Sequence, residues 1–236
     1  MTRTMQPIAV PAASFLLAVV IAILSGNPLR LLARQAAGNT CNDPVNLPIC
    51  IRPVSVAGGA EGGTTMNFTP QVLADMQTGI NAIWARCCIS FTVTLGDPVV
   101  FPKKKLFNEK GKLIAASTDG QTVTMNPLLD KTMQDKNSKK CLNLYYVNDA
   151  KENGLKKGED IKGIGYLGQN GMVVDDNVPP VVNAHELGHN LNLPHNNTPG
   201  NLMEETLKSN PGTGLNDIQC SDAKNRAQQY LAEFSR

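Results

Sequence analysis

The stretch His185-Glu-Leu-Gly-His189-Asn-Leu-Asn-Leu-Pro-His195 contains every histidine of the chain. On a helix, His185 and His189 lie one turn apart on the same face, so both imidazoles can bind one metal ion. Glu186 projects beside them, where it can act as a general base. A chain that places its whole histidine supply in one short segment is therefore predicted to hold a metal ion there.

His195 cannot lie on the same helical face as the first two histidines, so the chain must leave the helix and turn back before reaching it. Asn192 is the predicted turning point, because asparagine, after glycine, most readily adopts the left-handed conformation that ends a helix sharply. Pro194 then prevents the helix from continuing. The alternative, a helix with two surface histidines and an unrelated third, leaves these turn residues unexplained.

The segment resembles the zinc signature of the metzincin peptidases, HExxHxxGxxH followed by a methionine turn. Asn201-Leu202-Met203 supplies the candidate for that turn. Carried over by position, the resemblance implies Glu186 as the general base and Met203 as the hydrophobic floor under the metal. The implied zinc ligands are His185, His189 and His195. The family's glycine is Asn192 here, and asparagine is the best substitute for glycine at positive φ.

The residues after Met203 narrow the resemblance. Glu204 and Glu205 follow, with no tyrosine, so the chain is more similar to matrixin-like members than to those that add a tyrosine ligand from this turn. The resemblance implies an α+β catalytic domain with a mixed twisted sheet, an active-site helix and a C-terminal helix. The implied function is that of a secreted zinc-dependent endopeptidase, which activates water with one Zn²⁺ and a glutamate base.

Two other classes of function fit the same motif. One is a catalytically idle binding or adhesion module that keeps its metal for structure, and the other is a zinc hydrolase of a non-peptide substrate. Glu186 argues against the first class, because a structural zinc usually takes four protein ligands and needs no base. The motif alone does not exclude the second.

In the resembled family the substrate lies extended along an edge strand above the zinc. By order in the chain, the corresponding residues are Ile164, Gly165, Tyr166, Leu167 and Gly168, and backbone pairing there would bind a protein or peptide with little regard to sequence. A plain hairpin of the core sheet is an equally acceptable interpretation of this segment. No basic stripe with interleaved aromatic residues occurs, so nucleic acid is not expected as a ligand, and we expect a monomer.

Residues 1–38 are expected to be a targeting segment with a short linker, and residues 39–236 the catalytic domain. Arg3 precedes an apolar run whose core, residues 12–24, is shorter than the ~20 residues of a membrane-spanning helix. A secretory signal is the preferred interpretation, which makes the domain extracellular. The alternative is an uncleaved N-terminal anchor, which would hold the domain at a membrane, outside the cytoplasm.

Six cysteines follow this segment, as expected for a protein of an oxidising compartment. They are Cys41, Cys50, Cys87, Cys88, Cys141 and Cys220. We expect three disulfides whose pairing the sequence leaves open, except that the adjacent Cys87 and Cys88 should not pair with each other. Cys41 or Asp43 could instead approach the zinc as a short inhibitory plug, although a disulfide is the preferred role for Cys41.

Elsewhere, hydrophobic periodicity predicts strands at residues 47–56, 89–95, 141–147, 164–167 and 172–174. A helix is expected over residues 70–87 with Trp84 in the core. Pro179 and Pro180 should open the metal helix, and a last helix should run from residue 216 or 217 to 234. Residues 97–140 are expected to form an irregular insertion with short strands at 113–116 and 122–125. Asp175 and Asp176 suggest Ca²⁺, but two adjacent carboxylates fall short of the oxygens that calcium takes.

Overall fold

The computed structural model describes residues 41, 43–59, 63–103, 106–107, 113–118, 123–125, 127–148, 150–153, 162–176, 178–205 and 212–236. All of them belong to one unit, Asn39–Arg236. The predicted targeting segment, residues 1–38, lies outside the described residues. In the described part of the chain, no helix is both long and apolar enough to cross a membrane.

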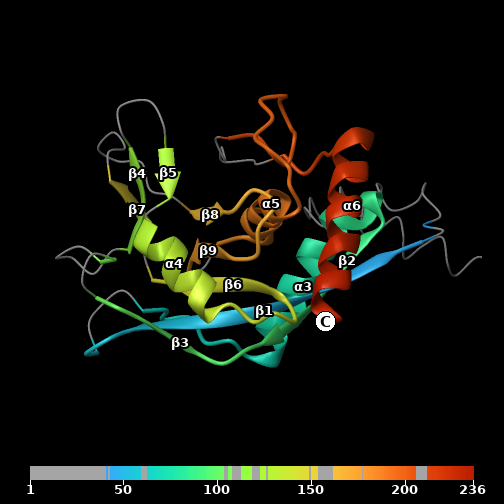
Figure 1. The fold of residues 1–236 in the computed structure, drawn as a ribbon. Coiled ribbons are helices and arrows are strands. Elements are labelled where there is room, and N and C mark those ends of the chain that lie inside the picture. The colour runs from blue at the N-terminus through green and yellow to red at the C-terminus, as the bar shows by residue number, and fades with distance from the viewer. Residues whose placement is uncertain are drawn as a thin grey trace, which may run out of the picture. The chain divides into compact units, whose positions relative to one another are not determined.

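The main sheet contains six strands, five of them in the order β2-β1-β6-β9-β8 and the sixth, β3, paired with β1 (Figure 1). Their bounds are β1 Val45–Val56, β2 Ile89–Leu95, β3 Val99–Phe101, β6 Leu142–Val147, β8 Gly163–Gly165 and β9 Met172–Asp175. All pairings are parallel except that of β8 with β9. The sheet is therefore mixed but mostly parallel, and β8 stands at one end of the strand order.

Both faces of this sheet are buried, because successive residues of its strands point into two different cores. Tyr146 and Val174 belong to a main core with helices α3, α5 and α6, whereas Tyr145 and Val173 belong to a second core with helix α4. The four α-helices of the described residues are α3 Pro70–Trp84, α4 Pro127–Lys136, α5 Pro180–Asn190 and α6 Asp217–Phe234. Trp84 lies in the main core, as predicted.

Helix ends follow the local sequence. Thr69 caps α3, and its hydroxyl accepts the Val72 N–H at 3.3 Å. A short 3₁₀ helix, η1 (Ala85–Cys87), continues α3 and ends at Cys88 in the left-handed conformation. The start of α6 carries a capping box between Asn216 and Gln219. These ends lie within a few residues of the predicted ones.

Three disulfides join distant segments, and no described cysteine is free. The pairs are Cys41–Cys88, Cys50–Cys141 and Cys87–Cys220. The adjacent cysteines thus reach different partners, as predicted. The inhibitory plug is wrong for Cys41, because its sulfur is bonded to Cys88, and the Asp43 carboxylate lies 3.7 Å from Lys224 Nζ. Three disulfides are typical of proteins that fold in an oxidising environment.

The segment predicted as an irregular insertion is more regular than expected. It contains β3, helix α4 and two strands of a second sheet, ordered β5-β4-β7. The bounds of that sheet are β4 Leu113–Thr118, β5 Val123–Met125 and β7 Ala150–Asn153. The prediction missed α4 because its buried face consists of little more than Leu129 and Met133, one turn apart among polar residues.

Candidate metal centre

Helix α5 carries the first two histidines through the main core. It begins at Pro180, a position where the missing N–H of proline does no harm, and residues 182–188 are all buried. The helix packs against α3, β8 and β9, and Figure 1 shows it almost end-on beside these two strands. Neighbours on several sides fix the direction in which each α5 side chain points.

The chain turns back directly after α5, at Asn192. Its φ is 68°, so the left-handed conformation predicted there is present. The Asn192 N–H donates to His189 O and the Leu193 N–H donates to Gly188 O, both at 2.9 Å. These two bonds around one left-handed residue form a Schellman motif. Leu187 and Leu193 lie together in the main core, which supplies the apolar contact of that motif.

His185, His189 and His195, the histidine cluster, lie close together. One ring nitrogen of each lies within 4.8 Å of those of the others, and the Nε2 atoms of His189 and His195 are 3.2 Å apart. Two nitrogens on one tetrahedral Zn²⁺ would lie about 3.3 Å apart at usual bond lengths, so the cluster fits a shared metal ion. Among the described residues, no other group of three or more such ligands occurs.

Two imidazoles of the cluster are oriented by backbone carbonyls. Nδ1 of His185 donates to Leu202 O at 2.7 Å, and Nδ1 of His189 donates to Leu193 O at 2.8 Å. Because a carbonyl oxygen only accepts, each ring carries its proton on Nδ1 and keeps Nε2 free for a metal. Burial lowers the pKa of His185 to about 4 and that of His189 to about 3. Both rings are therefore neutral near pH 7, the form that binds metal ions.

Glu186 is buried between α5 and strand β8, with 4% of its surface exposed. Its carboxylate accepts a hydrogen bond from the Gly165 N–H, and burial raises its pKa to about 8. Strand β8 has glycines where it meets this side chain. A Cβ at Gly163 would lie 2.6 Å from Oε1, and one at Gly165 would lie 3.1 Å from Oε2. A larger residue at Gly163 would displace the carboxylate, whereas one at Gly165 would first meet the backbone carbonyl of Glu186, 2.6 Å from the added Cβ.

Met203 is completely buried against α5. Its side chain occupies the space over Gly188, where a Cβ would overlap Sδ and lie 3.0 Å from Cε. The glycine of the motif therefore lets the methionine approach the helix closely. Asn196, the neighbour of His195, donates its N–H to Met203 O at 2.7 Å, which joins the methionine turn to the segment carrying the third histidine.

A pair of buried amides joins the methionine turn to helix α6. Asn201 and Gln219 exchange two hydrogen bonds of 2.8 and 3.1 Å, and Asn201 Oδ1 also accepts the Met203 N–H at 2.9 Å. Since the carbonyl of Leu202 orients a histidine, α6 supports the cluster without contributing to it. The sequence analysis did not predict this role of α6. The signal that could have pointed to Gln219 was its spacing from Asn216, which is that of a capping box.

The predicted substrate strand is longer than the strand observed. Ile164 and Gly165 lie in β8, whereas Tyr166, Leu167 and Gly168 lie beyond its end. Ile164 and Tyr166 pack against the second core, and Leu167 is 53% exposed. After the end of β8, Gly168 takes a φ of 67° in the turn that leads into β9.

The two aspartates considered for calcium have protein partners. Asp175 is buried and lies 3.4 Å from Lys162 Nζ. Asp176 accepts hydrogen bonds from the Thr64 hydroxyl at 2.5 Å and from the N–H and hydroxyl of Thr65 at 2.5 and 2.9 Å. These contacts attach the chain before α3 to the end of β9, and nothing in them calls for a cation.

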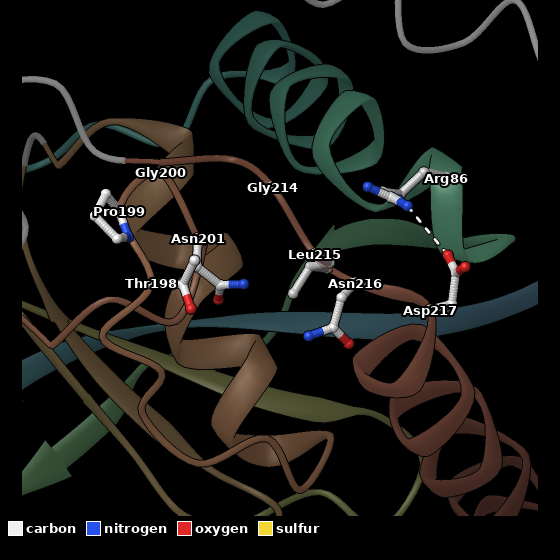
Figure 2. Close-up of a pocket in the computed structure, with 9 residues that line it drawn as sticks. All are labelled: Arg86, Thr198, Pro199, Gly200, Asn201, Gly214, Leu215, Asn216 and Asp217. Carbon is white, nitrogen blue, oxygen red and sulfur yellow. Dashed lines mark hydrogen bonds and ion pairs between the residues drawn. The ribbon is translucent and has the colours of Figure 1, made fainter.

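A pocket of about 370 Å³ lies between the segment before Met203 and the start of α6 (Figure 2). Its lining residues are Arg86, Thr198, Pro199, Gly200, Asn201, Gly214, Leu215, Asn216 and Asp217. Arg86 and Asp217 form an ion pair of 3.2 Å there. Asn201 of the methionine turn lines this pocket, but none of the three histidines, Glu186 or Met203 does.

No protein-family model matches the sequence, and a search of curated proteins finds no match. Solved structures do match this chain, including the following two. A chain of a chaperone-substrate complex is 14% identical with a TM-score of 0.39, over 81% of this chain and 39% of that one. Metalloproteinase-II from Bacteroides fragilis is 10% identical with a TM-score of 0.47, over 83% of this chain and 60% of that one. This chain thus spans less than two thirds of either protein, and likeness at this level assigns it no family.

Proposed function

We propose that this chain is a zinc-dependent endopeptidase of the matrixin-like metzincin type. The histidine cluster supports the proposal best, because three imidazoles converge and two of them keep an unprotonated nitrogen available. Three protein ligands are typical of catalytic zinc sites, which leave a further position open. A buried glutamate follows the first histidine directly, where a general base is needed.

Bound zinc would lower the pKa of a water molecule to about 7 and polarise the carbonyl of the scissile bond. The side chains supply the remaining functions. His185, His189 and His195 hold the ion in a fixed place. Glu186 takes up a proton at its carboxylate during the attack and delivers it to the leaving amine. Burial raises the pKa of Glu186 to about 8 in the metal-free site, and the positive charge of a bound zinc would lower it again, toward the ionised carboxylate that acts as a base.

Strand β8 is our candidate for the surface that binds the substrate backbone. Among the described residues it pairs only with β9, and it ends the strand order of the sheet. The Glu186 carboxylate lies against Gly163 and Gly165 of this strand. A peptide added to the free edge in extended form would therefore pass next to the base, and backbone hydrogen bonds would bind it with little regard to its sequence.

We also propose that the domain is secreted and acts as a monomer on protein or peptide substrates. The three disulfides support folding in an oxidising compartment. Residues 1–38 would supply the secretory signal. Mass spectrometry of the protein recovered from culture medium tests this, since a cleaved signal leaves a new N-terminus and an anchor leaves the chain in the membrane fraction.

Elemental analysis combined with casein digestion tests the activity. The wild type should contain one zinc per chain and cleave casein, and His189→Ala should lose most of its zinc. Glu186→Ala should keep zinc and lose hydrolysis, while Asp222→Asn, which neutralises an exposed carboxylate of α6, should change neither. Full zinc in His189→Ala would exclude the ligand assignment. A zinc-loaded wild type that cleaves neither casein nor gelatin would favour the idle module or the non-peptide hydrolase.

A further inference from the structure

Asn190, the last residue of α5, connects the helix to the turn between β8 and β9. It is completely buried. Its Nδ2 group donates two hydrogen bonds, to Tyr166 O at 3.1 Å and to Gly171 O at 3.0 Å. These two carbonyls lie at opposite ends of the turn, one just after β8 and the other just before β9. A single amide therefore holds both ends of the turn to the helix that bears the histidines.

The oxygen of the same amide is unpaired among the described residues. Both of its N–H groups are used, but in the described part of the chain its Oδ1 atom has no hydrogen-bond partner although it is buried. An unpaired buried acceptor loses its hydration without replacement, which offsets much of what the two donated bonds contribute. Asn190 therefore acts mainly by fixing the position of the turn relative to α5.

Two further contacts hold the turn in the same place. The Gly168 N–H donates to His189 O at 2.7 Å, and Gly168 O accepts from Arg226 Nε at 3.1 Å. The guanidinium of Arg226 lies 3.8 Å from the ring centroid of Tyr230 and pairs with Glu233 at 2.7 Å, so it is itself held firmly. The turn is thus attached to α5 on one side and to α6 on the other.

We propose that Asn190 is a positioning residue that fixes where the free edge of β8 lies relative to the histidine cluster. The proposal rests on the proposed function, in which an extended peptide adds to that edge. Without the Asn190 amide, β8 would keep its pairing with β9 but could shift relative to α5. The docked backbone would then be misplaced, while the metal ligands would stay where Leu193 and Leu202 hold them.

The test compares Asn190→Ala with Asn183→Ala. Asn183 is a matched control, since it is a completely buried amide of the same helix, also has one unpaired atom, and bonds Tyr146 instead of the turn. The loss of two neutral hydrogen bonds should raise KM for a peptide substrate on the order of tenfold in Asn190→Ala. Its kcat and zinc content should stay within about twofold of the wild type, and Asn183→Ala should keep the wild-type KM.

Hydrogen exchange of the metal-free proteins gives a readout that needs no activity. Amides of residues 163–171 should exchange faster in Asn190→Ala than in Asn183→Ala, and equal exchange overturns the proposal. Equal KM values in the two variants overturn it as well. So does a fold-decrease in the zinc content of Asn190→Ala that is as large as its fold-increase in KM. A wild type that cleaves no peptide refutes the proposed function instead, and exchange then still decides whether Asn190 fixes the turn. If Asn190→Ala does not fold, Asn190→Ser, which keeps a small polar side chain, takes its place.

Discussion

Asn192 allows a direct test of how backbone conformation controls metal binding. Its φ of 68° lies in the left-handed region, where an ordinary L-residue costs about 1–2 kcal/mol and glycine costs almost nothing. Asn192→Gly should therefore preserve zinc affinity and hydrolysis. Asn192→Val should impair both, because a β-branched residue at positive φ is a serious steric outlier.

The structure gives the size of this effect. Asn192 is exposed, and the two hydrogen bonds of the turn join backbone groups that both variants retain. Backbone strain therefore dominates the difference, at roughly 2 kcal/mol for valine. If the strain is relieved by moving His195 away from the cluster, the same energy appears in the zinc equilibrium. At about 1.4 kcal/mol per factor of ten, zinc affinity should fall roughly thirtyfold.

Chelator competition measures the zinc affinity, peptide hydrolysis measures kcat/KM, and circular dichroism shows whether the fold persists. Asn197→Val is the matched control, since Asn197 is also exposed, lies in the same loop and does not have a positive φ. Zinc affinity and kcat/KM should fall together in Asn192→Val alone. Equal values in the Val and Gly variants would refute the reasoning and remove the support for His195 as third ligand.

Gly163→Ala should displace the Glu186 carboxylate, because a Cβ there would lie 2.6 Å from Oε1, and should lower kcat/KM by up to about a hundredfold at unchanged zinc content; wild-type kinetics would exclude the packing described for β8. In metal-free protein, the Glu186 pKa is raised from 4.5 unfolded to about 8 folded, so the contribution of Glu186 to native stability falls as pH rises between these values, while the lowered pKa values of His185 and His189 act in the opposite direction. Glu186→Gln should remove this contribution, so the free energies of unfolding of wild type and variant, measured with urea, should diverge by roughly 4 kcal/mol between pH 5 and pH 8. Parallel pH profiles of the two proteins would contradict the prediction. Replacing Cys87 and Cys220 together by alanine should lower the free energy of unfolding by about 2–5 kcal/mol. Peptide mapping of the wild type should find no free thiol among the described cysteines.

The convergence of the three histidines could be predicted because the information for it is local. The helical spacing of His185 and His189, and the left-handed preference of Asn192, act over a few residues of chain. The caps at Thr69 and Asn216 are also local signals, and the starts of α3 and α6 could be predicted closely for that reason. Short-range stereochemistry alone decides such features.

The supports of the centre could not be predicted, because they depend on which segments the fold brings together. Nothing near Asn190 in the sequence indicates that its amide meets two carbonyls of a hairpin. Gln219 could be identified as part of a cap, but not as the partner of Asn201. The disulfide pairing stayed open for the same reason, since only the fold places Cys87 beside Cys220.

In the proposed endopeptidase, helix α6 determines how activity and zinc would be lost under proteolysis. It contributes neither a histidine nor the glutamate, yet Gln219 holds the methionine turn and Arg226 holds the turn after β8. The Cys87–Cys220 bridge secures only the first turn of the helix, whereas Tyr230 and Glu233, which fix Arg226, lie in its last turns. Trimming of the carboxyl terminus would therefore loosen the peptide-docking edge before it released the metal. A clipped chain would still contain zinc and its disulfides but would bind its substrate poorly.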